Sequence, residues 1–186
     1  MNTANPDRVK TIGILGSGQL GRMLAIAAAQ LGIRSHIYAP DAANSPAGDI
    51  AHKTTTASYD DTAALAAFAA TVDAVTSEFE NVPAEVMATL GADCAVSPGE
   101  AALHTAQHRI REKTLARKLG IETPKFWPIT SSPDLKVAMQ EHGRPCILKT
   151  CTLGYDGKGQ VRIKPTDDLD AAFASLGTDD AILEEM

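Results

Sequence analysis

Residues 9–21 read VKTIGILGSGQLG, and this stretch decides the class of fold. Its first seven residues are rich in apolar and β-branched types, which predicts a strand over 9–15. The glycines of residues 16–18 then turn the chain. Beyond the turn, apolar side chains recur at helical spacing and Gly32 follows the last of them, which predicts a helix that ends there. These side chains are Leu20, Met23, Leu24, Ala27 and Leu31.

The residues that follow repeat this alternation of strand and helix. Apolar runs predict the strands, and helical spacing of apolar residues predicts the helices between them. The predicted strands are 34–39, 73–79 and 94–96, and the predicted helices are 61–71 and 83–90. The order βαβαβαβα indicates an α/β fold, with a parallel sheet, helices on its faces and right-handed crossovers. We therefore expect a Rossmann-like domain over residues 1–103.

A break in composition follows this parallel part. Residues 104–119 form a polar, basic segment that predicts a helix ended by Gly120, and Pro124 interrupts the chain soon afterwards. We expect a connecting helix at 104–122 and a second domain at 123–186. Its predicted strands are 125–129, 145–151, 159–164 and 180–186, and its predicted helices are 132–142 and 166–176. Two of these strands are joined by a loop alone, which predicts an antiparallel hairpin in a small α+β module.

The composition restricts the classes of function. The 186 residues have a formal net charge of -6, with 44% hydrophobic and 22% charged residues, as is typical of a folded, water-soluble protein. The negative charge argues against partners such as nucleic acid or an anionic membrane, because both require a cationic face. The longest apolar stretch, residues 23–31, is far shorter than the roughly 20 residues of a membrane-spanning helix. Three cysteines without C-x-x-C spacing and a polar start predict a reduced, cytoplasmic protein.

The first glycine motif, GSGQLG at residues 16–21, matches G-x-G-x-x-G between a strand and a helix. Glycines at such a turn let an anionic ligand approach backbone N–H groups at the positive end of a helix. Asp41 follows 20 residues after Gly21, where an NAD-dependent reductase would place the acid that binds ribose. Folds of this class use the same turn to pack a helix on a strand or to bind other phosphates, so several ligands remain open.

The second glycine motif, GYDGKG at residues 154–159, lies between two predicted strands. Its flexible backbone presents N–H groups that can close over phosphate oxygens. A Walker A motif would need Ser or Thr after Lys158 and a helix beyond it, whereas a strand follows here. The alternative is an ordinary hairpin turn. Lys149 favours the phosphate-binding interpretation, because it ends an apolar run five residues before the loop.

Acidic residues at strand ends are further candidates for ligand binding. Glu184 and Glu185 end the last predicted strand, where carboxylate and backbone groups can meet an adenine edge. Glu78 and Glu80 follow the third strand at the carboxyl edge of the parallel sheet, where open α/β sheets bind ligands. In each case a solvated acid is the simpler alternative.

Two other groups of charged residues favour a simple structural role. His104 and His108 are four residues apart, but no H-E-x-x-H motif surrounds them, so we expect surface histidines and no metal site. The basic residues of the same segment predict a solvated helix in a chain that is acidic overall. They are Arg109, Arg111, Lys113, Arg117 and Lys118.

Four segments carry a family resemblance. They are GSGQLGRM at 16–23, SEFENV at 77–82, ILK at 147–149 and GYDGKGQ at 154–160. In this order, and along essentially all 186 residues, the chain resembles the 5-(carboxyamino)imidazole ribonucleotide synthase family of ATP-grasp ligases. The resemblance implies that residues 1–103 are a pre-ATP-grasp domain and that 123–186 are the ATP-grasp lid domain, truncated at its end.

The resemblance also implies a reaction. ATP phosphorylates bicarbonate to carboxyphosphate, and the amine of 5-aminoimidazole ribonucleotide captures the carboxyl group in purine biosynthesis. The cofactors would be ATP and Mg²⁺. The resemblance assigns ATP binding to Arg109, Lys149, Gly154, Tyr155, Asp156, Gly157, Lys158, Gly159, Gln160, Glu184, Glu185 and Met186. It assigns catalytic contacts from the lid to Tyr155, Asp156 and Lys158, and substrate binding to Gly18, Gln19, Leu20, Glu78 and Glu80.

A third domain of this family, which carries the metal ligands, has no counterpart in the 186 residues. We therefore expect this chain to be inactive alone and the full-length protein to be a homodimer. Three alternatives remain: another ATP-grasp purine enzyme such as folate-independent glycinamide ribonucleotide formyltransferase, an NAD-dependent reductase, and a non-catalytic nucleotide-binding module.

Overall fold

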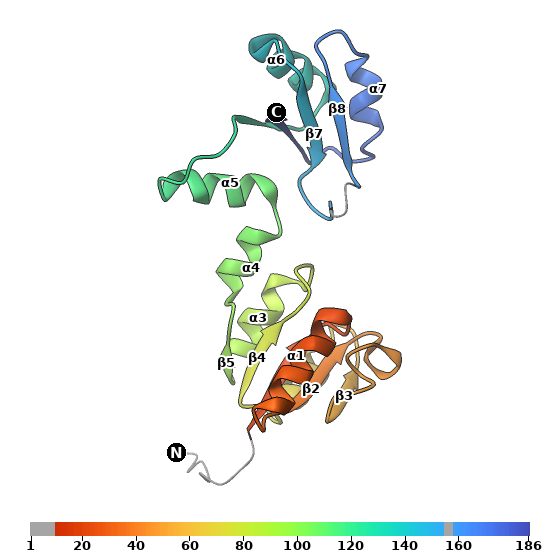
Figure 1. Ribbon diagram of the computed structural model, residues 1–186, viewed down its shortest axis with the longest axis vertical. Helices are drawn as coiled ribbons and strands as arrows, with labels where there is room; N and C mark the ends of the chain where they lie inside the picture. Colours follow the sequence, from red (N-terminus) through yellow and green to blue (C-terminus); the bar gives the residue numbers. More distant parts are fainter. Residues whose placement is uncertain (1–9, 155–157) are drawn as a thin grey trace. The chain divides into compact units, whose positions relative to one another are not determined.

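The computed structural model describes residues 10–154 and 158–186 (Figure 1). The chain divides into two compact units, Met1–His104 and Thr105–Met186. Each unit contains its own sheet and its own hydrophobic core.

Unit 1 contains a five-stranded parallel sheet with the strand order β3-β2-β1-β4-β5. The strands are β1 (Thr11–Leu15), β2 (Arg34–Ala39), β3 (Lys53–Thr56), β4 (Ala74–Ser77) and β5 (Ala95–Val96). The predicted parallel α/β arrangement is confirmed. Strand β3 was not predicted, because its sequence KTTT has no apolar alternation and it lies at an edge of the sheet.

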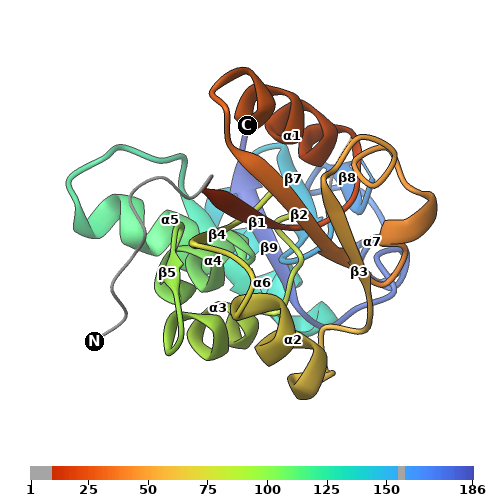
Figure 2. The same cartoon turned by 90° about the horizontal axis from the view of Figure 1, so that it is seen from below.

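Helices cover both faces of this sheet (Figure 2). Successive side chains of β1 point to opposite faces, so Ile14 packs with Ala25 of α1 whereas Leu15 packs with Phe68 of α2 and Met87 of α3. The helices are α1 (Gln19–Gln30), α2 (Thr62–Ala69) and α3 (Ala84–Gly91), with a short 3-10 helix η1 (Ala42–Asn44) after β2. This sandwich of helix, sheet and helix fixes the carboxyl ends of β1, β2 and β4 at one edge.

Helix α1 buries its small residues and exposes its large ones. Gly21, Ala25 and Ala28 face the sheet, which lets the helix backbone approach closely. The apolar side chains that predicted this helix are largely exposed, since Leu20 is 58% and Leu31 is 77% accessible. The spacing therefore predicted the helix correctly without identifying its buried face.

The helix predicted over 104–119 is two helices. Helix α4 (Glu100–Ala106) ends before His108, which has an extended backbone, and α5 (Arg109–Lys118) begins after it. The N–H of Arg109 donates to the carbonyl of Cys151 at 3.0 Å, a bond that a continuous helix would have directed to Thr105. The single-helix prediction was wrong because this long-range bond cannot be read from local sequence.

Unit 2 contains a four-stranded antiparallel sheet with the order β6-β9-β7-β8. Its strands are β6 (Phe126–Ile129), β7 (Cys146–Thr150), β8 (Gln160–Ile163) and β9 (Ala181–Glu185), and its helices are α6 (Ser132–His142) and α7 (Leu169–Ala174). The predicted hairpin is confirmed, because β7 pairs with β8 from Cys146 opposite Ile163 to Lys149 opposite Gln160. Leu135 and Met139 of α6 are buried in the core of this unit. Lys149 and Gln160 are therefore the last paired residues of this hairpin before the glycine segment.

Candidate functional site

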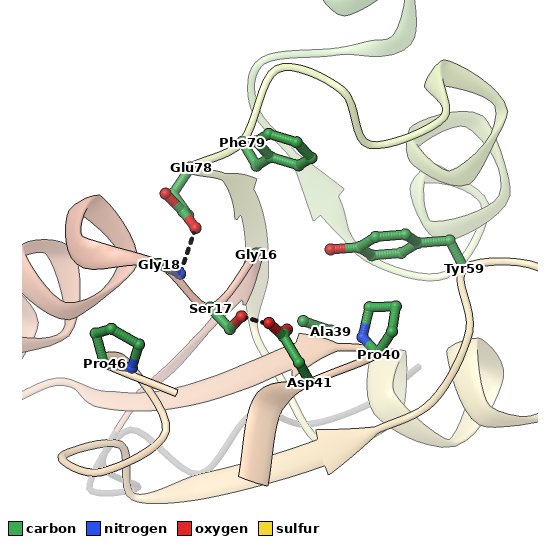
Figure 3. A pocket seen from close by; sticks show the side chains of 10 residues that line it. All are labelled: Gly16, Ser17, Gly18, Ala39, Pro40, Asp41, Pro46, Tyr59, Glu78 and Phe79. Atoms are coloured by element: carbon green, nitrogen blue, oxygen red, sulfur yellow. Dashed lines mark hydrogen bonds between the residues drawn. The ribbon is translucent and has the colours of Figure 1, made fainter. Parts of the chain in front are cut away.

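A pocket of about 500 Å³ lies at the carboxyl edge of the parallel sheet in unit 1 (Figure 3). Its walls come from the residues that follow three strands: Ser17 after β1, Asp41 after β2, and Glu78 with Phe79 after β4. Tyr59, from the segment between β3 and α2, completes it. This is the edge at which open parallel sheets bind ligands.

The glycine turn in this pocket already holds an anion. The N–H of Gly18 donates to Oε1 of Glu78 at 2.8 Å, so a carboxylate of the protein occupies the positive end of α1 (Figure 3). Gly16 has a φ of +104°, and a Cβ there would lie 2.6 Å from the same carboxylate oxygen, so this close approach requires glycine. Gly18 and Glu78, which were both predicted to bind substrate, are therefore hydrogen-bonded to each other. The carboxylate of Glu78 lies against the glycine turn.

The remaining residues predicted to bind substrate lie elsewhere on the surface. Gln19 and Leu20 begin α1 with exposed side chains, and Glu80 is exposed and does not line the pocket. Asp41, considered as a ribose-binding acid, accepts a hydrogen bond from Oγ of Ser17 at 2.6 Å.

The pocket is acidic. Burial, and then the nearby charges of Asp41 and Glu78, raise the pKa of Tyr59 to about 12, so its phenol is neutral at physiological pH. None of the described residues that line the pocket is lysine or arginine. Such a pocket favours ligand groups that donate hydrogen bonds, such as hydroxyls and amines, over phosphate.

In unit 2, Arg109 holds the base of the second glycine loop. Its Nε donates to the carbonyl of Thr150 at 3.1 Å, and its terminal nitrogen donates to the carbonyl of Gly154. Gly159 has a φ of +66°, and a Cβ there would lie 2.8 Å from Oγ1 of Thr150. The loop base therefore requires glycine, and Arg109 joins it to the start of α5.

Two lysines flank one buried carboxylate beside this loop. Glu184 is 6% exposed, and its Oε2 lies 2.9 Å from Nζ of Lys149 and 3.4 Å from Nζ of Lys113. The interpretation of Lys113 as part of a solvated basic helix was wrong, because its side chain is only 19% exposed. A usable signal was present: Lys113 follows Arg109 by four residues, so both lie on one face of α5.

The rest of the predicted ATP-binding set is placed as follows. Tyr155, Asp156 and Gly157 lie outside the described residues, and Lys158 is exposed. Gln160 begins β8 opposite Lys149. Glu185 ends β9 with its N–H bonded to the carbonyl of Lys125 at 2.9 Å, and Met186 follows with 62% of its surface exposed.

His108 is not a surface histidine. Its side chain is 18% exposed, and Nε2 lies 3.1 Å from Oδ1 of Asp180. Cys151 is buried beside this pair. Burial, and then a hydrogen bond to Asp180, raise the pKa of the Cys151 thiol to about 12, so it is protonated at neutral pH. This thiol is therefore no candidate nucleophile.

The described helices include none with the length and apolar character needed to cross a membrane.

Two family patterns match the chain in succession. Residues 9–107 match the ribonucleotide synthetase preATP-grasp domain, and residues 114–186 match the ATP-grasp domain. The chain belongs to the ribonucleotide synthetase preATP-grasp family. The residues matched by the preATP-grasp family include those that line the pocket at the edge of the parallel sheet. The residues matched by the ATP-grasp domain include Lys149 and the glycine loop.

Named relatives agree with this assignment. The chain is 46% identical over 180 residues to the bifunctional purine synthesis protein purC/E of Dictyostelium discoideum, covering 94% of this chain and 18% of that protein. It is 45% identical over 176 residues to N5-carboxyaminoimidazole ribonucleotide synthase of Brucella melitensis, covering 94% of this chain and 48% of that enzyme. The chain thus spans about half the length of the synthases it matches.

Solved structures show the same fold. An N5-carboxyaminoimidazole ribonucleotide synthetase in complex with ADP matches with a TM-score of 0.89 and 37% identity, covering 95% of this chain and 47% of the other. A synthase from Aspergillus clavatus in complex with ADP and 5-aminoimidazole ribonucleotide matches with a TM-score of 0.81 and 26% identity, covering 96% and 46% of the two chains.

Proposed function

We propose that the protein carrying this chain is an ATP-grasp ligase that carboxylates 5-aminoimidazole ribonucleotide with bicarbonate in de novo purine biosynthesis. The observation that carries the proposal is the arrangement of Arg109 and Lys149 at the base of the glycine loop. These two cations come from a helix and a strand of the part that matches the ATP-grasp domain. Relatives named as this synthase share both parts of the chain.

The proposed ATP site uses Arg109 and Lys149 for the phosphates and residues 154–160 as the lid. Lys149 forms an ion pair with Glu184, so contact with a phosphate would draw it from that carboxylate. Lys113 then remains beside Glu184 and prevents a buried, unpaired charge. Adenine would bind at the end of β9, beside Glu184, Glu185 and Met186.

The proposed ribonucleotide site is the acidic pocket of unit 1. Glu78 and Asp41 suit the ribose hydroxyls and the exocyclic amine, which donate hydrogen bonds. The phosphate would lie away from the pocket, because the N–H of Gly18 is bonded to Glu78 and no cation is among the described lining residues. Gly18, Gln19 and Leu20 were assigned to substrate binding by the resemblance; in this proposal Gly18 contributes by holding Glu78 and does not bind the phosphate.

The proposed chemistry has two steps. A bicarbonate oxygen attacks the γ-phosphorus of ATP, and ADP leaves with formation of carboxyphosphate. The substrate amine then attacks the carboxyl carbon, phosphate leaves, and the amine loses its proton to give the carbamate. Tyr155, Asp156 and Lys158 of the lid are proposed to reach the reacting groups.

Mg²⁺ would neutralise phosphate oxygens in the first step. The described residues beside Lys149 do not suit this metal, because the carboxylate of Glu184 already faces two lysines. We therefore expect the Mg²⁺ ligands outside this chain and assign none to it. We also propose domain ranges of 1–103, 104–122 and 123–186, a cytoplasmic location and a homodimer for the full-length protein.

The test is release of ADP by the full-length protein with bicarbonate and aminoimidazole ribonucleotide present or omitted. We expect turnover to require both substrates, and we expect none from the 186-residue chain alone. Turnover with formate and glycinamide ribonucleotide would instead indicate the formyltransferase alternative. Calorimetric titrations with NADH and with ATP distinguish the ligase from the reductase, because only the reductase would bind NADH.

A further inference from the structure

Three potential metal ligands meet in unit 2, outside the ATP site proposed above. His108 precedes α5, Cys151 follows β7 and Asp180 precedes β9. One ligand atom from each residue lies within 4.8 Å of the others. The three residues are as much as 72 positions apart in sequence, so the fold alone brings them together.

The backbone holds these segments in place. The N–H of Arg109 donates to the carbonyl of Cys151 at 3.0 Å, and the N–H of Cys151 donates to the carbonyl of Asp180 at 2.9 Å. These bonds join the three segments at Cys151, at Asp180 and at the residue that directly follows His108. The cluster is therefore preorganised, and little ordering entropy would oppose binding.

The side chains leave bonding capacity unused. Nδ1 of His108 is buried and has no hydrogen-bond partner in the described parts of the chain. Cys151 is 1% exposed, whereas the Asp180 side chain is 47% exposed and gives an ion access from solvent.

We propose that His108, Cys151 and Asp180 bind a zinc ion. Thiolate, imidazole and carboxylate are the ligand types that Zn²⁺ accepts, and three protein ligands leave a fourth position for water. Zinc bonds of about 2.0 to 2.3 Å place tetrahedral ligand atoms roughly 3.3 to 3.7 Å apart. The observed separations, 3.1 Å between His108 and Asp180 and at most 4.8 Å overall, require only small movements.

Zinc binding replaces the thiol proton of Cys151, which passes to solvent, and also replaces the hydrogen bond between Nε2 of His108 and Oδ1 of Asp180. The neutral imidazole then carries its proton on Nδ1, and its Nε2 lone pair faces the ion. The proposal is independent of the ligase function, because neither Lys149 nor the pocket of unit 1 takes part. A bound ion would tie the start of α5, and hence Arg109, to the end of β7 and the start of β9.

The first experiment titrates Zn²⁺ into the 186-residue chain against a chromophoric chelator and repeats the titration with Co²⁺. We expect one zinc per chain and a thiolate-to-cobalt charge-transfer band. A chain that binds no zinc, or whose cobalt spectrum lacks the thiolate band, would overturn the proposal without any variant.

The second experiment uses variants that retain hydrogen bonding but are poor ligands. Cys151→Ser and His108→Gln should each weaken zinc binding by about 100-fold or more, which exceeds the usual effect of removing an outer-shell partner. Cys94→Ser is the matched control, because Cys94 is the more accessible thiol and should leave zinc affinity unchanged. Circular dichroism establishes that each metal-free variant is folded. Equal zinc affinity in the chain and in folded Cys151→Ser would refute the site.

Discussion

The two glycine segments of this protein look alike in sequence and differ in electrostatics. In unit 1 the turn at Gly16 to Gly18 receives the carboxylate of Glu78, and the pocket around it is acidic. In unit 2 the loop base at Gly154 is held by Arg109, with Lys149 on the strand that leads to it. Glycine permits close approach in both cases, but the charges supplied by distant residues decide what approaches.

A glycine motif therefore specifies a backbone conformation, but it does not specify which ligand binds there. The helix start in unit 1 has its anion built in, so a phosphate would have to displace Glu78. The cations beside the loop in unit 2 contact protein groups, and we propose that they turn from these groups to phosphate oxygens. Substitutions at the charged residues beside each segment should therefore have different effects on ligand binding.

Lys149→Ala should remove the cation that distinguishes the second loop from the first. We expect ATP to bind the chain roughly 10- to 100-fold more weakly, because a hydrogen bond to a charged group contributes roughly 1.5 to 3 kcal/mol. Calorimetric titration with ATP measures the change. Lys164→Ala removes an exposed lysine just after β8 and should leave ATP affinity unchanged. Equal affinities for both variants would contradict the assignment of Lys149.

Acid should weaken unit 1 through His36. Burial, and then the charges of Lys53 and His52, lower the pKa of His36 from 6.5 to about 4. Between these values the unfolded chain binds a proton that the folded chain excludes, so stability falls as the pH falls, by on the order of 1 kcal/mol per pH unit.

Urea unfolding of unit 1, followed at about pH 7 and about pH 5, measures this loss. His36→Gln should reduce the pH dependence, whereas His104→Gln, which changes an exposed histidine, should keep it. An unchanged pH dependence in the His36 variant would assign the loss to other groups.

Lys113→Met should reveal how the cations of unit 2 share Glu184. The carboxylate keeps Lys149 as its partner, so we expect a loss of about 1 kcal/mol in unfolding free energy and a several-fold loss in ATP affinity. The second effect arises because Lys149 can no longer leave Glu184 without stranding its charge. Lys118→Met, on an exposed position of the same helix, is the control. Unchanged ATP affinity in Lys113→Met would show that the two lysines act independently.

Glu78→Gln should make the first glycine segment resemble the second. The amide oxygen can still accept the hydrogen bond from Gly18, but the negative charge is gone. We expect inorganic phosphate to bind a few-fold more tightly near Gly18, since a charge at a helix start contributes roughly 0.3 to 1 kcal/mol. The NMR shift of the Gly18 amide during a phosphate titration measures it, with Glu85→Gln as an equal change of charge. No difference between the two variants would mean that Glu78 does not exclude anions.

Much of the architecture was predictable because its signals are local. The run ILGSG before an apolar helix indicates a strand and turn, and the hairpin of β7 and β8 follows from two strands with a short glycine loop between them. Strand β3 was missed because its sequence has no apolar alternation, and the break at His108 was missed because it depends on a partner far away in sequence. In the candidate site, Arg109, Lys149 and Glu78 were predicted, whereas the role of Lys113 was not.

The order of elements, the two glycine turns and the charged residues near them follow from the sequence, since spacing and residue type act over a few positions. Which charge lies beside which turn depends on the tertiary structure. Glu78 reaches Gly18 from 60 residues away, and His108 reaches Asp180 from 72. Such pairs form because the sheets bring distant strand ends to one edge, and no periodic pattern in the sequence predicts which residues lie together there.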